Sequence, residues 1–291
     1  MSECGPSPVE VFHACDAMAT RFEICLVGDE REHLDAVANA ALEEIARIER
    51  LLSRFDPRSE VSRVNRHAAM EPVLVDVELF EILRCCLEWR NRTEGFFDVT
   101  ADADSQRGEL LLDERSRTAR FTNGAMRLDF GAFGKGYALD CVVELLGEYS
   151  VGRALIHGGT SSVLGLGSDA AGRPWQVGIR APWQAEDARG GELGQVVLDG
   201  RAISTSGVLA REASESDLID PHLGRRLTGQ AACTVVARSA AEAEVLSTAL
   251  LCMGRERAAA YTARNAGDEW SAAWASIDTG IPRLQWFNRP I

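Results

Sequence analysis

The chain contains a single lysine, Lys135, among its 31 basic residues. It lies in the segment Asp129-Phe-Gly-Ala-Phe-Gly-Lys-Gly-Tyr-Ala-Leu-Asp140, where Gly134 and Gly136 leave space for a ligand to approach the backbone. Lysine offers a compact point charge, whereas arginine is a bulky planar fork. A strand, a glycine turn and a helix start in succession would aim helix N–H groups and this ammonium at a phosphate. The segment therefore predicts an anion-binding site, and chance survival of one lysine is the alternative.

A carboxylate and a hydroxyl stand one helical turn apart at Glu244 and Thr248. Residues four apart on a helix share a face. Both are hard oxygen ligands of the kind that Mg²⁺ or Ca²⁺ prefers, and we group with them the polar segments Ile203-Ser-Thr-Ser-Gly207 and Asp217-Leu-Ile-Asp-Pro221. The pair predicts a metal site, although a glutamate on a helix is more often a solvated charge.

Two further segments are rich in polar or glycine residues. In Thr93-Glu-Gly-Phe-Phe-Asp-Val-Thr100, Asp98 could hydrogen-bond a heterocycle while Phe96 and Phe97 stack on it; the alternative is a capped turn with core phenylalanines. In His157-Gly-Gly-Thr-Ser-Ser162 a backbone cradle with His157 as a base competes with an ordinary tight turn.

The elements that position these segments follow from hydrophobic periodicity. Residues 22–27 alternate like a strand, and residues 34–52 place apolar side chains on one face of a long helix. Ser239-Ala-Ala-Glu242 is typical of a capping box that begins a helix ending at Gly254. A second helix is expected around residues 77–87, and short strands are expected at residues 127–130, 154–157, 175–179, 195–198 and 233–237. Glycine-rich turns separate these strands, which favours an α+β fold with mainly antiparallel sheet.

Composition excludes several classes of protein. A net charge of −13 argues against a nucleic-acid binder, which needs a basic face. No apolar run approaches the roughly 20 residues of a membrane span. The N-terminus has neither the positive start nor the apolar stretch of a signal peptide, so no lipoprotein signal precedes Cys4 and we expect a cytoplasmic location. The eight cysteines lack C-x-x-C spacing, which argues against zinc.

Taken in order, the motifs resemble the FAD:protein FMN transferase (ApbE-like) family from about Met18 to Trp286. The most specific match is the segment from Asp129 to Ala138. The others are Met18-Ala-Thr20, Ser53-Arg-Phe55, Ser59-Glu-Val-Ser-Arg-Val-Asn65, Thr93-Glu-Gly-Phe-Phe-Asp98, Gly158-Gly159, Thr205-Ser-Gly207, Ile219-Asp-Pro221 and Leu246-Ser-Thr-Ala-Leu250. The resemblance implies an ApbE-like (T-fold-like) architecture, with residues 1–16 as an N-terminal extension and residues 17–288 as a single domain.

The resemblance also implies an activity and a set of site residues. Such a protein binds FAD and, with Mg²⁺ (or Ca²⁺ or Mn²⁺), transfers FMN to a threonine hydroxyl of a target flavoprotein subunit, releasing AMP. By motif position, the FAD contacts would be Met18, Phe55, Asn65, Phe96, Phe97, Asp98, Asp129, Lys135 and Ile219. The metal ligands would be Ala132, Glu244 and Thr248, and the catalytic residues Asp217 and Asp220.

The chain departs from the family pattern at four positions. Glu244 replaces the usual aspartate, one methylene shorter, and Asp217 replaces the histidine expected to be the base for the target threonine. Carboxylates are ordinarily weaker bases than imidazoles. Thr160 stands where an aspartate commonly follows the two glycines, and Phe55 replaces a tyrosine. The alternative function is therefore an FAD-binding or FAD-hydrolysing relative that modifies no protein.

Overall fold

A computed structural model describes residues 8–100, 108–180, 183, 191–210, 217–278 and 281–288. Its central element is an eight-stranded sheet in which every neighbouring pair of strands is antiparallel. The mainly antiparallel α+β fold is thereby confirmed. In spatial order the strands are β1 (Val9–Ala17), β2 (Thr20–Gly28), β6 (Ala154–Gly158), β7 (Ser162–Leu166), β10 (Arg201–Ala210), β13 (Gly229–Ala237), β14 (Ser271–Asp278) and β15 (Ile281–Trp286).

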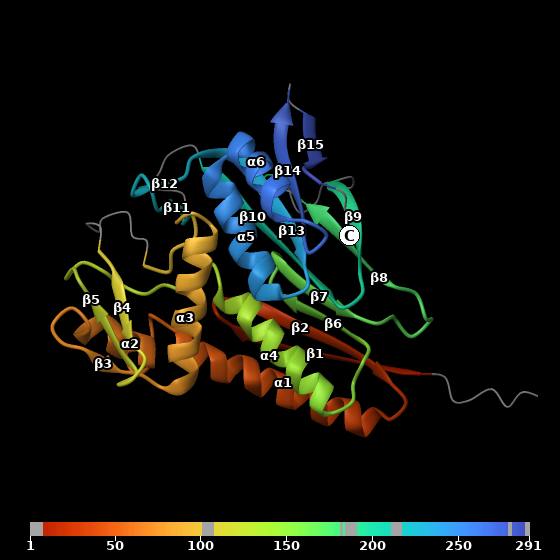
Figure 1. The fold of residues 1–291 in the computed structure, drawn as a ribbon. Helices are drawn as coiled ribbons and strands as arrows, with labels where there is room; N and C mark the ends of the chain where they lie inside the picture. Colours follow the sequence, from red (N-terminus) through yellow and green to blue (C-terminus); the bar gives the residue numbers. More distant parts are fainter. Residues whose placement is uncertain are drawn as a thin grey trace, which may run out of the picture.

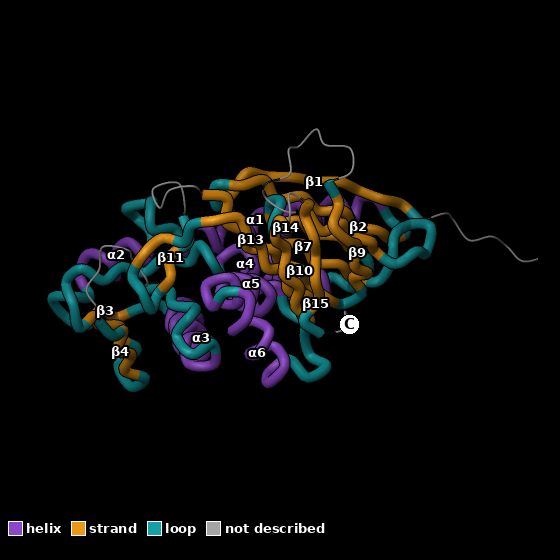
Figure 2. Tube along the Cα trace, turned by 90° about the horizontal axis from the view of Figure 1, so that it is seen from above, coloured by secondary structure: helices purple, strands orange, loops and turns teal. Residues whose placement is uncertain are grey.

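Four helices cover one face of this sheet (Figures 1 and 2). They are α1 (Arg31–Leu52), α4 (Gly134–Glu148), α5 (Ala240–Met253) and α6 (Arg255–Asn265). The long helix α1 forms because apolar residues recur every three or four positions, and its buried stripe runs from Leu34 to Leu52. Helix α5 is buried on nearly all sides, between the sheet and its neighbouring helices. No helix in the described ranges is both long and apolar enough to cross a bilayer.

Among the described residues, a β-hairpin covers part of the opposite face of the sheet. The hairpin of β8 (Trp175–Arg180) and β9 (Glu192–Leu198) packs on β7, β10 and β15. A second, smaller hydrophobic core lies beneath this hairpin and includes Val163, Leu198 and Ile203.

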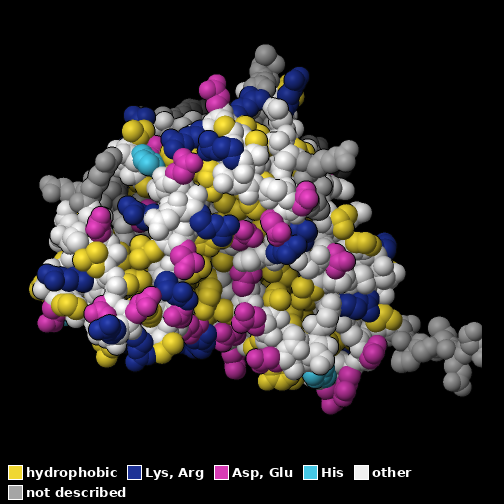
Figure 3. Space-filling view, in the orientation of Figure 1, with side chains coloured by type: hydrophobic (Ala, Val, Ile, Leu, Met, Phe, Trp, Pro, Cys, Tyr) yellow, Lys and Arg dark blue, Asp and Glu magenta, His cyan; other side chains and the backbone are white. Residues whose placement is uncertain are grey.

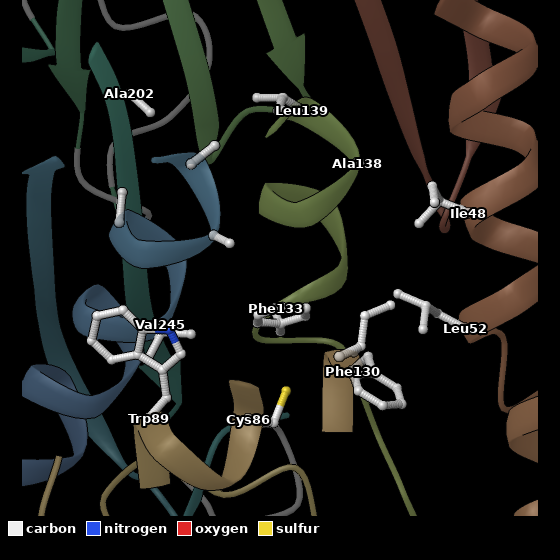
Figure 4. Packing of buried hydrophobic residues seen from close by; sticks show 14 of the residues in the cluster. Ile48, Leu52, Cys86, Trp89, Phe130, Phe133, Ala138, Leu139, Ala202 and Val245 are labelled. Carbon is white, nitrogen blue, oxygen red and sulfur yellow. The ribbon is translucent and has the colours of Figure 1, made fainter. Parts of the chain in front are cut away.

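A smaller group of elements lies at the end of the sheet where α3 stands (Figure 1). It comprises α2 (Glu60–His67), α3 (Val77–Arg92), a sheet of β3 (Val73–Leu74), β5 (Thr118–Phe121) and β4 (Leu110–Asp113), and the hairpin of β11 (Ile219–Asp220) and β12 (Arg225–Arg226). The main hydrophobic core continues into it. Figure 4 shows Trp89 of α3 beside Val245 of α5, and Phe130 beside Leu52 of α1.

Most of the expected elements are confirmed, among them β2, α1, α3, β6, β8, β9, β13 and α5 with its Ser239 cap. The strand expected at residues 127–130 is wrong. Its backbone is tied to other segments, because the side-chain amide of Asn65 bonds both the N–H and the carbonyl of Leu128, and Asp129 N–H donates to Val99 O. Residues 9–16, expected to be an extension, belong to β1 and pair with β2 along the main sheet.

Candidate functional site

A cavity of about 620 Å³ brings together most of the residues expected to bind ligands. Its walls come from the loops before α2 and α4, the loop after α3, strand β10, the β11–β12 hairpin and helix α5. The expected site residues that line it are Phe55, Phe96, Phe97, Asp98, Asp129, Ala132, Lys135, Asp217, Ile219, Glu244 and Thr248.

Glu244 on α5 is a carboxylate buried at the N-terminus of α4. Its side chain is 4% exposed, and its Oε2 accepts a 2.6 Å hydrogen bond from Gly136 N–H. Its Oε1 pairs with the ammonium of Lys135, which also donates to Gly131 O at 3.1 Å. A helix N-terminus stabilises negative charge. At Gly136 the N–H expected to face a phosphate therefore binds a carboxylate of the protein itself.

Gly136 allows α4 and α5 to approach closely enough for this contact. A Cβ at Gly136 would lie 2.5 Å from Ala240 O and 2.6 Å from Ala241 Cα, both backbone atoms of α5. A Cβ at Gly134 would meet only Leu52 Cδ1 at 3.5 Å and the Phe130 Cβ at 3.7 Å, which are ordinary contacts. Helix packing, rather than access for a ligand, accounts for the glycine at position 136.

The hydroxyl of Thr248 is hydrogen-bonded to Ser206, which also bonds Ser247. Ser206 Oγ lies 2.9 Å from Thr248 Oγ1 and 2.8 Å from Ser247 Oγ. Ala132, Glu244 and Thr248 line the same cavity, so the three expected metal ligands lie around one space. Within the described residues no group of three His, Cys, Asp or Glu side chains could hold a metal by itself. The donors fit a hard cation of the type that shares its coordination with waters and substrate phosphates.

The aromatic residues of the site differ sharply in exposure. Phe55 is 81% exposed, and the Arg54 guanidinium lies 4.7 Å from its ring centroid. Phe96 and Phe97 are 5% and 2% exposed and belong to the main core. The Phe96 ring already contacts two neighbours. Its centroid lies 4.2 Å from the ring centroid of His222 and 4.4 Å from the guanidinium carbon of Arg257. Phe55 is thus the ring with most surface available for stacking on a ligand.

The two aspartates expected to contact FAD are partly occupied by protein groups. Asp129 forms an ion pair with Arg54 at 3.2 Å and accepts from Gly131 N–H at 2.8 Å. Asp98 accepts from Arg90 Nε at 2.7 Å and from the N–H and hydroxyl of Thr100. Carboxylate oxygens accept several bonds each, so both can still receive a ligand donor.

Three expected site residues are not among those lining the cavity, and the structure gives each a role in shaping the backbone. Met18 lies in the β1–β2 turn with φ of 50° and donates its N–H to Glu49. Asn65 fixes the segment at Leu128. Asp220 is buried and accepts from the N–H groups of the two residues after Pro221. A sequence motif does not distinguish such residues from those that contact a ligand.

His157 lies away from this cavity. It borders a separate cavity over β1, β2 and β6, together with Phe12 and Glu23. Burial lowers the pKa of His157 below its ordinary value, and the nearby Glu23 carboxylate opposes that shift. The expected tight turn at Gly158-Gly159 is thus the better account of this segment than a catalytic base.

Motif reasoning missed three arginines that line the cavity, Arg54, Arg127 and Arg226. Arg54 stands inside the Ser53-Arg-Phe55 motif, so the motif could have indicated it as a site residue. No motif in the sequence analysis pointed to Arg127 or Arg226. A second cavity, between α3, α4 and α5, contains none of the expected residues and is lined partly by apolar side chains. Figure 3 shows hydrophobic side chains gathered over this part of the surface.

Comparison with known proteins gives consistent results. The model of the ApbE family matches residues 18–106 and 104–270. An FAD:protein FMN transferase of Klebsiella pneumoniae is 26% identical over 78% of this chain and 79% of its own length. One from Vibrio cholerae is 26% identical over 74% of this chain and 72% of its length. The apo flavinyl transferase ApbE of Pseudomonas stutzeri superimposes with a TM-score of 0.81 at 23% identity, covering 96% of this chain and 94% of that one. The chain belongs to the ApbE family.

Proposed function

We propose that this protein is an FAD:protein FMN transferase, which moves FMN from FAD to a threonine hydroxyl of a target flavoprotein subunit. The observation that carries the proposal is one cavity holding an exposed aromatic ring, a lysine at a helix start and a carboxylate–hydroxyl pair. The threonine oxygen bonds to the phosphorus of the FMN half, the bond from that phosphorus to the bridging oxygen breaks, and AMP leaves with that oxygen.

Each part of the cavity suits one part of FAD. Phe55 offers a face for an aromatic ring system, and the cations Lys135, Arg127 and Arg226 can neutralise the pyrophosphate. Phosphoryl transfer depends mainly on positioning and on neutralising charge. A divalent cation, Mg²⁺ or else Ca²⁺ or Mn²⁺, held by Ala132 O, Glu244 and Thr248 would supply further neutralisation at the pyrophosphate.

Asp217 is the proposed base for the acceptor threonine. It lines the cavity and its side chain is exposed, so an incoming hydroxyl can reach it. It receives the hydroxyl proton as the oxygen bonds to phosphorus. Asp220, buried and committed to the adjoining turn, holds the β11–β12 hairpin rather than the substrate. A cytoplasmic location stays a prediction of the N-terminal sequence.

The test is incubation with FAD, Mg²⁺ and a flavoprotein subunit that carries an acceptor threonine, followed by mass spectrometry of that subunit. We expect a mass increase of one FMN group, with AMP in solution, and no increase when the acceptor threonine is replaced by valine. If FMN and AMP are released while the subunit stays unmodified, the protein is an FAD hydrolase, which is the alternative function.

A further inference from the structure

The ammonium of Lys135 occupies the carboxylate that the proposed metal site would use. It pairs directly with Glu244, the one carboxylate among the three proposed metal ligands. The Lys135 side chain is 20% exposed and borders the cavity, whereas Glu244 is nearly inaccessible. Glu244 also receives the Gly136 N–H, so the lysine and the helix N-terminus together balance its charge.

We propose that Lys135 is the internal counter-ion of Glu244 and that it exchanges this carboxylate for the FAD pyrophosphate. Before FAD binds, Lys135 competes with a divalent cation for Glu244. Once the pyrophosphate attracts Lys135, the carboxylate becomes available and the cation binds tightly. The inference rests on the proposed function, because it takes FAD as the ligand whose phosphates attract Lys135.

Burial makes such a counter-ion necessary. A carboxylate removed from water is costly unless another charge or hydrogen bonds compensate it. The described residues bring one ammonium and one backbone N–H to Glu244. A divalent cation added to this neutral pair would meet the repulsion of the ammonium, so its affinity for the FAD-free protein is low.

The exchange is physically easy for a lysine. Its charge is carried on a flexible four-carbon chain with rotatable donors, whereas a guanidinium is planar and keeps a fixed fork. The neighbouring contact of Lys135, with Gly131 O, lies on the same turn that lines the cavity. The ammonium can therefore leave the carboxylate for a phosphate without movement of α4. This gives a physical reason for a lysine at this position in a chain that otherwise uses arginine.

The exchange couples two ligands. If FAD releases Glu244 for the cation, the cation must by linkage raise the affinity for FAD by the same factor. Part of this coupling arises because the cation binds the pyrophosphate directly, and the Lys135 exchange adds to it. Removing the lysine should strengthen cation binding without FAD and reduce the coupling between the two ligands.

The experiment measures Mn²⁺ binding to the FAD-free protein from the electron paramagnetic resonance signal of free Mn²⁺. Lys135→Met should bind Mn²⁺ about tenfold more tightly than wild type, within the range typical of coupled sites. Arg54→Met removes another cavity charge, one that pairs with Asp129 instead of Glu244, and serves as the matched control. Unchanged or weaker binding in Lys135→Met, or an equal gain in Arg54→Met, overturns the inference.

A second arm locates the effect. In the Glu244→Gln background Lys135→Met should give no gain in Mn²⁺ affinity; a gain there means that the metal binds elsewhere and the inference is wrong. Thermal unfolding of every variant verifies that it folds. FAD titration by flavin fluorescence, with and without Mn²⁺, should show a smaller enhancement in Lys135→Met than in wild type. None of these readouts uses flavin transfer. If the wild-type protein transfers FMN but Lys135→Met binds Mn²⁺ no more tightly than wild type does, this inference is wrong while the proposed function stands.

Discussion

Individual side chains at the cavity differ in whether they are free to act on a ligand. Asp217 and Phe55 are exposed, while Glu244, Asp129 and Asp98 are already hydrogen-bonded or ion-paired within the protein. A group that contacts the substrate needs hydrogen-bonding or stacking surface that faces the cavity and is not already used by the protein. The exposed groups are thus candidates for direct contact with the substrates, and the paired ones can bind a ligand or a cation only beside, or in exchange for, their protein partners.

Asp217→Asn tests the proposed base. Loss of the carboxylate should lower the rate of flavin transfer by about 10²–10⁴-fold, the usual contribution of a general base. The affinity for FAD should change little, because the base acts on the acceptor hydroxyl. Single-turnover transfer kinetics and FAD titration measure the two effects separately.

Asp220→Asn is the control, since its carboxylate accepts two backbone N–H bonds in the adjoining turn. It should lower the free energy of unfolding by roughly 1–3 kcal/mol through an imperfectly satisfied turn. A transfer rate in Asp217→Asn within about twofold of wild type contradicts a base of the usual strength.

Among the elements, the junction of α4 and α5 decides the geometry of the site. Asp140 of α4 accepts from Ser239 Oγ and from the N–H groups of Ala240 and Ala241, which fixes the start of α5. Gly136 removes the Cβ that would hold the helices apart. Together these contacts bring Glu244 to the N-terminus of α4. The metal and phosphate positions therefore depend on a helix–helix contact.

Gly136→Ala tests this junction. Its Cβ would overlap α5 backbone that cannot move independently, so the free energy of unfolding should fall by roughly 1–3 kcal/mol, as for other overpacked sites. Gly134→Ala is the matched control, because its Cβ meets only ordinary contacts. Urea denaturation of the two variants measures the difference. Equal free energies of unfolding for the two variants would show that close packing of α4 on α5 does not require a glycine at position 136.

At the scale of the whole molecule, helices cover one face of the sheet, and the β8–β9 hairpin packs on part of the other. Strands β1 and β6 carry Phe12, which is 71% exposed, and the partly buried His157. Because burial lowers the pKa of His157, the folded protein holds a proton there less readily than the unfolded chain does. Protonation of His157 therefore favours the unfolded chain.

The stability of the molecule should accordingly depend on pH through His157. Its contribution is present above the ordinary pKa of 6.5 and is lost as the pH falls through the lower folded value. The free energy of unfolding of wild type relative to His157→Gln should therefore decrease as the pH is lowered from 7 to 5. Urea denaturation across this range measures it, and a constant difference would mean that His157 titrates alike in both states.

Periodicity predicted those elements whose burial is simple. The apolar stripe of α1 gave the correct helix because that helix buries one face. Residues 22–27 gave the correct strand although its residues from Ile24 to Val27 are buried on both faces. The strand expected at residues 127–130 failed because Asn65, far away in the sequence, supplies hydrogen bonds that a neighbouring strand would have supplied. Strand β1 was not expected because its hydrophobicity does not follow its alternating burial: His13 lies on the same face as the buried Val11 and Ala17, while Phe12 is exposed on the other face.

The sequence by itself determined the family, through the order of its motifs, and, through local periodicity, three long helices and about a third of the strands. It also marked Lys135, Glu244 and Thr248 as residues with suitable chemistry. Only the tertiary structure decided that Lys135 and Gly136 N–H meet Glu244, 108 residues from Gly136 along the chain. The physical reason is that periodicity reports which face of an element is buried. Which side chains meet across two elements depends on how closely their backbones pack.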